Sequence, residues 1–277
     1  MDRRLTPATA RVAHVSLRGR LAAPLWTDGQ SLRVARPLVD LLRAPAGARE
    51  RQLVLGEGFT VIDQDLGHVF GFAEKDGYCG WLPLDAVAEG PRPTHWVASV
   101  GTHLYPEPRS ASHEVGALPM GARVEVLGQV DKWAETAVGF VPASHLRRLG
   151  DWLNDPVSVA EGFLGTPYLW GGNSRAGLDC SGLAQMVHHA CGIDFPGDAD
   201  LQEVGGHEIE ASEGVRRGDL LFWTGHIALV VDETRLIHAN GFTMSVAYEG
   251  LQACIARIAA AEGPVTHRRR LQATGQI

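Results

Sequence analysis

A glycine-rich turn that runs directly into a helix limits most strongly what this chain can fold into. The turn begins at Trp170-Gly171-Gly172, the apolar periodicity of a helix covers residues 183–191, and Gly192 follows as a helix-ending glycine. Cys180 therefore lies at or just before the first helical turn, where unpaired backbone N–H groups and the helix dipole favour an anion. Because the thiolate is the nucleophilic form of cysteine, this position indicates a catalytic residue.

Composition narrows the class of protein. A chain of 277 residues has room for about two or three domains of ~100–150 residues each. Its 45% hydrophobic and 21% charged residues are typical of a soluble globular protein. The formal charge of -7 gives no electrostatic support to nucleic-acid binding. We interpret the one basic run, residues 267–270, as a solvated tail.

The N-terminal sequence and the cysteines bear on the expected location of the protein in the cell. No apolar run of signal-peptide length follows Met1, and no stretch approaches the ~20 apolar residues that span a bilayer. Cys79, Cys180, Cys191 and Cys254 form neither metal-type pairs nor a dense disulfide framework. We therefore expect a cytoplasmic protein with free thiols, no membrane partner, and no metal or organic cofactor.

The first half of the chain has the texture of small β-barrels, in which short apolar runs alternate with turns. Residues 1–34 are predicted to form an extended arm that packs on the domain after it. The stretch 53–61 resembles 118–126, and 80–87 resembles 139–146. The two copies are offset by about 60 residues, the size of one small barrel. We predict barrels over residues 35–90 and 91–149.

A different domain is predicted over residues 150–277. Asp155-Pro156 opens a helix through Phe163, and a polar loop at 194–217 follows the Cys180 helix. The remaining apolar runs predict three strands and a closing helix, at residues 219–223, 226–231, 235–239 and 251–261. Helices followed by an antiparallel sheet define an α+β fold.

The strands supply partners for the cysteine. A cysteine nucleophile needs a base and a third polar group that orients the base. Two neighbouring antiparallel strands would bring His226 and His238 together, and packing of the Cys180 helix would bring the thiol to His226. The backbone N–H of Cys180 would then serve as an oxyanion donor. Taken singly, each residue also has a structural reading; the other cysteines and the pair His188-His189 are interpreted as packing residues.

Four sequence blocks in this domain resemble the NlpC-type cysteine peptidase family, which are papain-like bacterial enzymes that act on murein peptides. The blocks are residues 178–183, 217–223, 225–230 and 237–239. In the first barrel, residues 77–81 resemble the last strands of bacterial SH3-like domains, and the second barrel keeps a weaker match at residues 139–142. The whole chain is similar to the γ-D-glutamyl-L-diamino acid endopeptidases.

The resemblance implies roles for individual residues. Cys180 would be the nucleophile, His226 the base and then the acid, and His238 the orienting residue. The resemblance also implies a set of substrate-binding residues, namely Asp179, Ser181 and Tyr78 for the free amino terminus, Glu57 nearby, Tyr168 and Trp170 lining the cleft, and Asp198 in the following loop. Gly197 stands where the family often has an arginine, and Arg175 is a candidate substitute.

The expected function is hydrolysis of the γ-D-glutamyl–diamino acid bond in murein peptides with a free N-terminal L-alanine, in cell-wall peptide recycling. One alternative is an exported peptidoglycan hydrolase whose SH3-like domains bind the wall. Two others are a non-catalytic binding protein and an acyl transferase acting on lipids. Fast labelling of a thiol with a depressed pKa would distinguish an enzyme from a binding protein.

Overall fold

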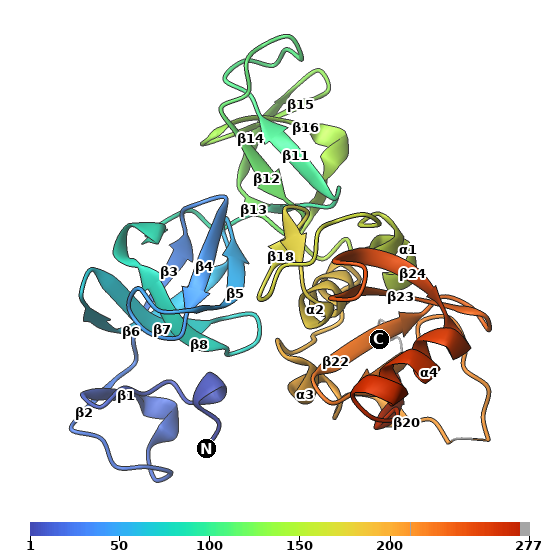
Figure 1. The fold of residues 1–277 in the computed structure, drawn as a ribbon. Coiled ribbons are helices and arrows are strands. Elements are labelled where there is room, and N and C mark those ends of the chain that lie inside the picture. The colour runs from blue at the N-terminus through green and yellow to red at the C-terminus, as the bar shows by residue number, and fades with distance from the viewer. Residues whose placement is uncertain (211, 272–277) are drawn as a thin grey trace. The chain divides into compact units, whose positions relative to one another are not determined.

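The computed structural model describes residues 1–210 and 212–271 and divides the chain into two compact units, Met1–Leu149 and Gly150–Ile277 (Figure 1). Among the described residues, the first unit is built of strands and 3-10 turns, and the second also contains α-helices. Within the same ranges, every helix is too short or too polar to cross a membrane.

The N-terminal arm packs on the first barrel but is shorter than predicted. It holds η1 (Arg3–Leu5), β1 (Val12–His14), η2 (Val15–Leu17) and β2 (Leu25–Thr27), and β1 pairs with β2 in parallel. Arg11 forms an ion pair of 2.9 Å with Asp63 of the barrel. The predicted boundary after residue 34 is wrong, because β3 (Gln30–Val34) pairs with β6 (Gly58–Asp65) and so belongs to the barrel sheet.

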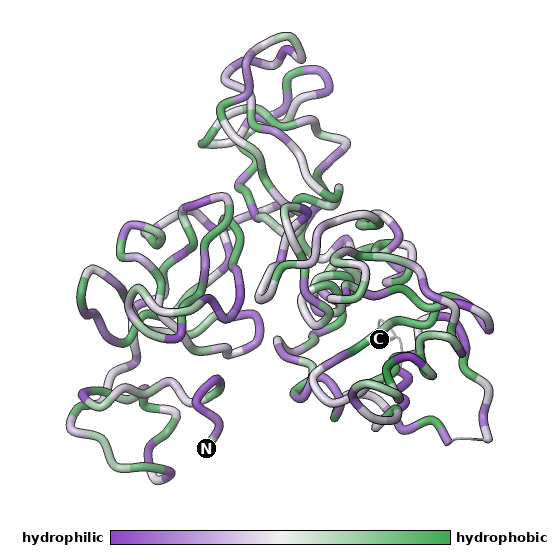
Figure 2. Tube along the Cα trace, viewed as in Figure 1, coloured by the Kyte–Doolittle hydropathy of each residue, from purple (hydrophilic) through white to green (hydrophobic). Residues whose placement is uncertain are grey.

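The first barrel is a single seven-stranded sheet with the strand order β5-β4-β8-β7-β6-β3-β9. Besides β3 and β6, it contains β4 (Leu38–Leu42), β5 (Arg49–Val54), β7 (His68–Ala73), β8 (Cys79–Pro83) and β9 (Val87–Ala88), with η3 (Leu84–Ala86) before β9. Figure 2 shows hydrophobic and hydrophilic residues interchanging at short intervals along these strands. Buried and half-buried residues alternate along β4, and Leu41, Phe59 and Leu82 belong to the core of the barrel.

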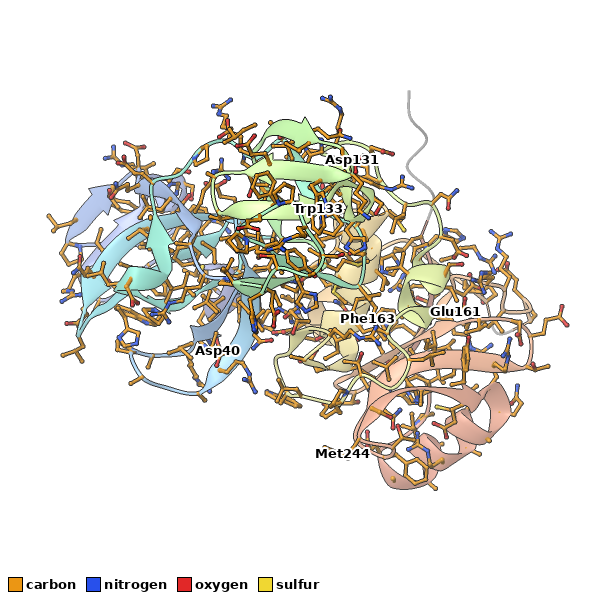
Figure 3. All side chains as sticks on the ribbon, turned by 90° about the horizontal axis from the view of Figure 1, so that it is seen from above. Asp40, Asp131, Trp133, Glu161, Phe163 and Met244 are labelled. Atoms are coloured by element: carbon orange, nitrogen blue, oxygen red, sulfur yellow. The ribbon has the colours of Figure 1, made fainter. Side chains whose placement is uncertain are left out.

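The second barrel is divided into three small sheets of three, two and three strands. It contains β10 (His95–Val97), β11 (Gly101–Leu104), β12 (Gly116–Pro119), β13 (Arg123–Val124), β14 (Val126–Val130), β15 (Trp133–Thr136), β16 (Gly139–Pro142), η4 (Ala143–His145) and β17 (Leu146–Arg148). Trp133, labelled in Figure 3, is buried. Over the repeated stretches 80–87 and 139–146, a strand, a 3-10 turn and a short strand follow one another in both barrels.

Gly56 allows its turn to lie in close contact with the segment that contains Arg123. Gly56 has a φ of +77°, and a Cβ there would lie 2.2 Å from the Arg123 carbonyl oxygen. The Arg123 N–H donates to the Leu55 carbonyl at 2.7 Å. A side chain at position 56 would break this hydrogen bond and strain the left-handed backbone.

The C-terminal unit is built on a six-stranded sheet with the order β20-β25-β21-β22-β23-β24. Its strands are β20 (His207–Glu208), β21 (Leu220–Trp223), β22 (His226–Val230), β23 (Arg235–Asn240), β24 (Ser245–Gly250) and β25 (His267–Arg270), and a separate small hairpin joins β18 (Asn173–Ser174) to β19 (Gly177–Leu178). The helices are α1 (Pro156–Glu161), α2 (Cys180–Ala190), α3 (Ala199–Gln202) and α4 (Leu251–Ala261). The predicted helices at α1, α2 and α4 and the antiparallel sheet are confirmed.

Three strands of this sheet were not foreseen, and one of them, β20, lies within the predicted polar loop at residues 194–217. β24 was missed, and the interpretation of residues 267–270 as a solvated tail is wrong, since β25 pairs with β21 inside the sheet. The reason is a buried ion pair: Arg270 donates from Nε at 2.7 Å and from a terminal nitrogen at 2.8 Å to the Asp219 carboxylate. Asp219 is 1% exposed, so the arginine neutralises a charge inside the fold.

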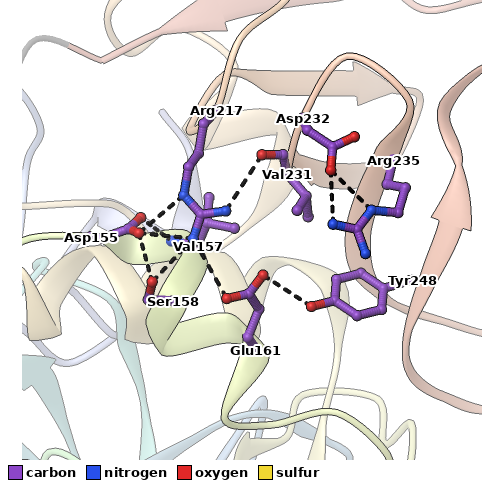
Figure 4. Close-up of polar contacts among 9 residues, drawn as sticks. All are labelled: Asp155, Val157, Ser158, Glu161, Arg217, Val231, Asp232, Arg235 and Tyr248. Carbon is purple, nitrogen blue, oxygen red and sulfur yellow. Dashed lines mark hydrogen bonds and ion pairs between the residues drawn. The ribbon is translucent and has the colours of Figure 1, made fainter.

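A polar network fastens α1 to the strand ends (Figure 4). Asp155, the N-cap of α1, accepts from the Val157 N–H at 3.0 Å and forms a 2.8 Å ion pair with Arg217. Glu161, at the end of α1, accepts from the Tyr248 hydroxyl at 2.9 Å. The network thus fixes α1 against β24 and against the segment that leads into β21.

Candidate active site

Asp179 closes the glycine turn onto the start of α2. As the N-cap residue, it accepts from the Gly182 N–H at 2.6 Å through Oδ1. Its Oδ2 accepts from the Gly171 N–H at 2.7 Å, and Ser181 donates its hydroxyl to Oδ1 at 3.2 Å. The carboxylate therefore satisfies one of the unpaired helix donors and holds the turn in place, which sets the direction of the neighbouring Cys180 side chain.

The Cys180 thiol meets the turn between β21 and β22. Its Sγ lies 3.9 Å from the Gly225 carbonyl oxygen, and the nearby Ile227 N–H lowers the pKa of the thiol. Gly225 and Ile227 are the two neighbours of His226 in the chain. The sulfur is therefore held beside His226, in a site where only 7% of Cys180 is exposed.

His226 and His238 form a hydrogen-bonded pair. The Nε2 of His226 and the Nδ1 of His238 are 2.8 Å apart. In the register of β22 and β23, Leu229 lies opposite Ile237, which places His226 and His238 diagonally on one face. The predicted proximity of the two imidazoles is confirmed. Since Nε2 of His226 is occupied, Nδ1 remains for exchange of a proton with the thiol.

Burial keeps the unliganded site neutral. It raises the pKa of Cys180 to about 12, with the neighbouring Asp179 charge adding to the effect. Burial likewise lowers the pKa of His226 to about 3 and that of His238 to about 4. The expectation of a depressed thiol pKa at the helix start is therefore wrong: desolvation outweighs the N–H groups near the sulfur. The thiol would lose its proton to His226 during the attack.

Alkylation tests this neutral pair. Because the resting thiol is protonated, iodoacetamide should modify Cys180 at pH 7 more slowly than it modifies a cysteine in an unfolded peptide. The rate should climb about tenfold per pH unit above neutrality, following the thiolate fraction. Mass spectrometry of digested protein gives the rate at this one cysteine. A fast rate that is constant below pH 7 would show a resting thiolate instead.

The buried imidazoles also predict sensitivity to acid. Burial lowers the pKa of His188 to about 4, so three histidines stay neutral in the fold. In the unfolded chain they bind protons below pH ~6.5, so the stability they contribute is complete above that pH and is lost as the pH falls towards 4. Urea unfolding between pH 6.5 and 5 should show a falling free energy, by up to about 1.4 kcal/mol per pH unit for each histidine. A flat profile would contradict the neutral burial.

The other predicted site residues of this unit differ in their exposure and in their contacts. Tyr168 is half-buried, and its pKa is raised by burial and by the nearby Cys180 and Asp179 groups. Trp170 is 70% exposed on the turn. Asp198 caps α3 through its backbone carbonyl, which accepts from the Leu201 and Gln202 N–H groups at 2.9 Å. Their contacts with substrate stay predictions.

Two candidates from the first barrel belong to the N-terminal unit. Tyr78 is 3% exposed within the barrel core, where the Arg51 guanidinium lies 5.8 Å from its ring centroid. The Glu57 carboxylate forms a 2.7 Å ion pair with Lys75 and accepts from the Val54 N–H at 2.9 Å. Their predicted part in substrate binding stays a prediction.

The residues around Gly197 show a feature that sequence reasoning missed. Gln202 is fully buried, and its side-chain amide donates to the Pro196 carbonyl at 2.8 Å and to the Ser181 carbonyl at 3.0 Å. This amide ties the loop to the first turn of α2. Arg175, the proposed substitute for an arginine at 197, donates to the Gly162 carbonyl at 3.0 Å. A glutamine in a polar loop carries no sequence signal for such a role.

Comparison with known proteins agrees with this geometry. Residues 165–257 match the NlpC/P60 family, and residues 41–87 match the bacterial dipeptidyl-peptidase SH3 domain. A solved NlpC/P60 family protein from Bacillus cereus superposes with a TM-score of 0.75 at 19% identity, covering 87% of this chain and 99% of that one. The C-terminal domain belongs to the NlpC/P60 family and has its papain-like α+β fold, and an SH3-type domain precedes it.

Named relatives point to one class of activity. A γ-D-glutamyl-L-lysine dipeptidyl-peptidase of Bacillus cereus is 25% identical over 81% of this chain and 83% of its own length. Dipeptidyl-peptidase 6 of Lysinibacillus sphaericus is 40% identical over 30% of this chain, and the match spans 31% of that relative. These relatives support a cysteine peptidase that hydrolyses peptidoglycan peptides.

Proposed function

We propose that this protein cleaves the γ-D-glutamyl–diamino acid bond of murein peptides that begin with a free L-alanine, releasing L-Ala-D-Glu. The observation that carries the proposal is the Cys180 sulfur next to the Gly225 carbonyl, directly before His226, whose ring is paired with His238. The similarity to enzymes named γ-D-glutamyl-L-lysine dipeptidyl-peptidase, in Bacillus cereus and Bacillus subtilis, supports the choice of bond.

The chemistry proceeds through a thioester. The Cys180 sulfur attacks the γ-carbonyl carbon of D-glutamate while its proton passes to Nδ1 of His226. Backbone N–H groups at the start of α2, that of Cys180 among them, stabilise the oxyanion. His226 then protonates the leaving amine, and the C–N bond breaks. A water molecule that His226 deprotonates attacks the thioester, releases the dipeptide acid and returns the proton to sulfur.

Asp179 supports the requirement for a free amino terminus. An ionised carboxylate offers about four acceptor positions. Three of these are taken by the Gly171 and Gly182 N–H groups and by the Ser181 hydroxyl. The remaining position can accept a hydrogen bond from the ammonium group of the substrate, which needs a negative partner once it leaves water. An acetylated amine would lose this charge pair.

Acetylation of the substrate tests this restriction. The kcat/KM for N-acetyl-L-Ala-γ-D-Glu-L-Lys should be about 100-fold or more below that for the free tripeptide, the loss expected when a buried charge loses its partner. Asp179→Asn should reduce this preference. Asp155→Asn is the matched control, since Asp155 caps α1 in the same way and should leave the preference unchanged. Equal hydrolysis of both peptides would contradict the proposed role of Asp179.

We further propose that free peptides in the cytoplasm are the substrates, in recycling of wall material. The match of residues 41–87 to an SH3 domain named after dipeptidyl-peptidases supports this reading. The second candidate is an exported wall hydrolase, which similarity to the muramidase/DL-endopeptidase CwlT of Bacillus subtilis favours (32% identity over 99 residues). Purified protein should release dipeptide from free tripeptide and little from intact sacculi, whereas the reverse order would favour the wall hydrolase.

A further inference from the structure

The His226–His238 pair continues into a carboxylate and a guanidinium that the proposed mechanism does not use. The Nε2 of His238 lies 3.2 Å from Oε2 of Glu249. Arg257 of α4 donates to both oxygens of Glu249, with Nε and a terminal nitrogen each at 2.8 Å. The register of β23 and β24 sets this arrangement, because Leu236 lies opposite Glu249 and His238 lies opposite Ala247, on one face.

The charge of Glu249 fixes where the protons lie. The bidentate Arg257 guanidinium holds the pKa of this carboxyl below its usual range. An ionised carboxylate only accepts hydrogen bonds, so the Nε2 of His238 must carry a proton and donate it. A neutral imidazole has one proton, and therefore the Nδ1 of His238 is an acceptor.

The position of the proton on His226 follows from that on His238. The Nδ1 of His238 accepts, so the partner nitrogen at 2.8 Å, Nε2 of His226, must donate its N–H. The pKa values of both histidines are lowered by burial, so each ring is neutral and has only this one proton. The Nδ1 of His226 is then left with its lone pair, as a base for the thiol requires.

We propose that Glu249 and Arg257 are positioning residues that set the tautomers of His238 and His226 and thereby make Nδ1 of His226 a base. The proposal rests on the cysteine peptidase mechanism given above. When His226 becomes an imidazolium during attack, the Glu249 charge also stabilises it through His238. Without this carboxylate, nothing in the pair itself decides which nitrogen of each ring carries the proton.

The guanidinium of Arg257 is the positive charge next to a cluster of side chains that could otherwise hold a metal ion. His238, Glu249 and Cys254 present donor atoms within 4.8 Å of one another, a set that metal ions bind in other proteins. Here a terminal nitrogen of Arg257 lies 2.8 Å from Glu249 and 3.9 Å from the Cys254 sulfur. The guanidinium therefore supplies the positive charge next to the carboxylate and leaves Nε2 of His238 free to hold its proton.

Replacement of the carboxylate by an amide tests the proposal. In Glu249→Gln, the amide N–H can donate to Nε2 of His238, which reverses both tautomers and puts a proton on Nδ1 of His226. We expect kcat to fall about 10–100-fold, as for other groups that orient a functional histidine, while KM changes little. Arg257→Lys should keep Glu249 ionised and retain most of the rate, and Arg257→Met should lose more of it.

A measurement of the histidine tautomers that needs no substrate tests this proposal independently of the proposed function. Long-range ¹H–¹⁵N spectra of histidine-labelled protein should show His226 protonated on Nε2 in the parent and on Nδ1 in Glu249→Gln. Tyr248→Phe is the matched control: it lies next to Glu249 on the same strand, loses a hydrogen bond to Glu161 and should change neither the spectrum nor the rate.

Unchanged His226 tautomers and an unchanged kcat in a folded Glu249→Gln variant would overturn the proposal. Should that variant fail to fold, the parent spectrum decides, because a parent His226 protonated on Nδ1 would also overturn the proposal. A parent enzyme that does not cleave the tripeptide would refute the proposed function alone, since the spectra still report the tautomers.

Discussion

Cys180→Ala should abolish peptide hydrolysis, with kcat falling roughly 10⁴-fold or more, because loss of a covalent nucleophile removes the thioester route entirely. The change deletes only one sulfur atom from a residue that is 7% exposed at the start of α2. The N-cap hydrogen bonds of Asp179 stay in place, so the variant should fold. Chromatography of the L-Ala-D-Glu released from the tripeptide measures the loss of kcat.

Cys191→Ala is the matched control for this variant. Cys191 is the C-cap residue at the opposite end of the same helix, is also a free thiol, and is half-buried. We expect its replacement to leave kcat within about twofold, as for a change away from the reacting atoms. If the alanine variant at 180 retained even a tenth of the parent rate, Cys180 could not be the nucleophile.

Arg270→Leu should lower the free energy of unfolding by about 3–5 kcal/mol, because it leaves the Asp219 carboxylate buried without its cation. Asp219 is 1% exposed, and both of its oxygens accept from Arg270. One of these oxygens also accepts from the Arg216 N–H at 2.8 Å, which cannot replace a positive charge. Urea unfolding followed by fluorescence at pH 7.5 measures the difference.

An exposed ion pair provides the control for Arg270→Leu. Arg235 and Asp232 form a 2.8 Å pair with 49% and 41% of their side chains exposed. Arg235→Leu should therefore change the free energy of unfolding by less than about 1 kcal/mol. Similar losses in the two variants would mean that burial of Asp219 does not govern the stability of this part of the sheet.

Local sequence signals were enough to predict helices α1, α2 and α4 and strands β21, β22 and β23 of the C-terminal unit. Asp155-Pro156 and Gly192 gave reliable helix ends, and α4 has the predicted bounds. The repeat in the barrels was also visible, because each copy has a glycine with positive φ at the equivalent place, Gly56 between β5 and β6 and Gly121 between β12 and β13. These features depend on a few neighbouring residues, which a sequence displays directly.

Features that depend on distant partners were not predictable. The basic run that contains Arg270 looked like a solvated tail because its partner, Asp219, lies far away in sequence. Glu249 was missed with its strand, so the extension of the histidine pair was missed as well. The thiol pKa was predicted with the wrong sign, because the degree of burial of Cys180 follows from tertiary packing and not from its place on the helix.

Identification of the bond that is cut tests the central claim most directly. Purified protein is incubated with L-Ala-γ-D-Glu-L-Lys, or with the diaminopimelate analogue, and the products are identified by mass spectrometry. The mechanism predicts L-Ala-D-Glu and the free diamino acid in equal amounts, dependent on Cys180. Release of free L-alanine, or equal products from the Cys180→Ala variant, would contradict it.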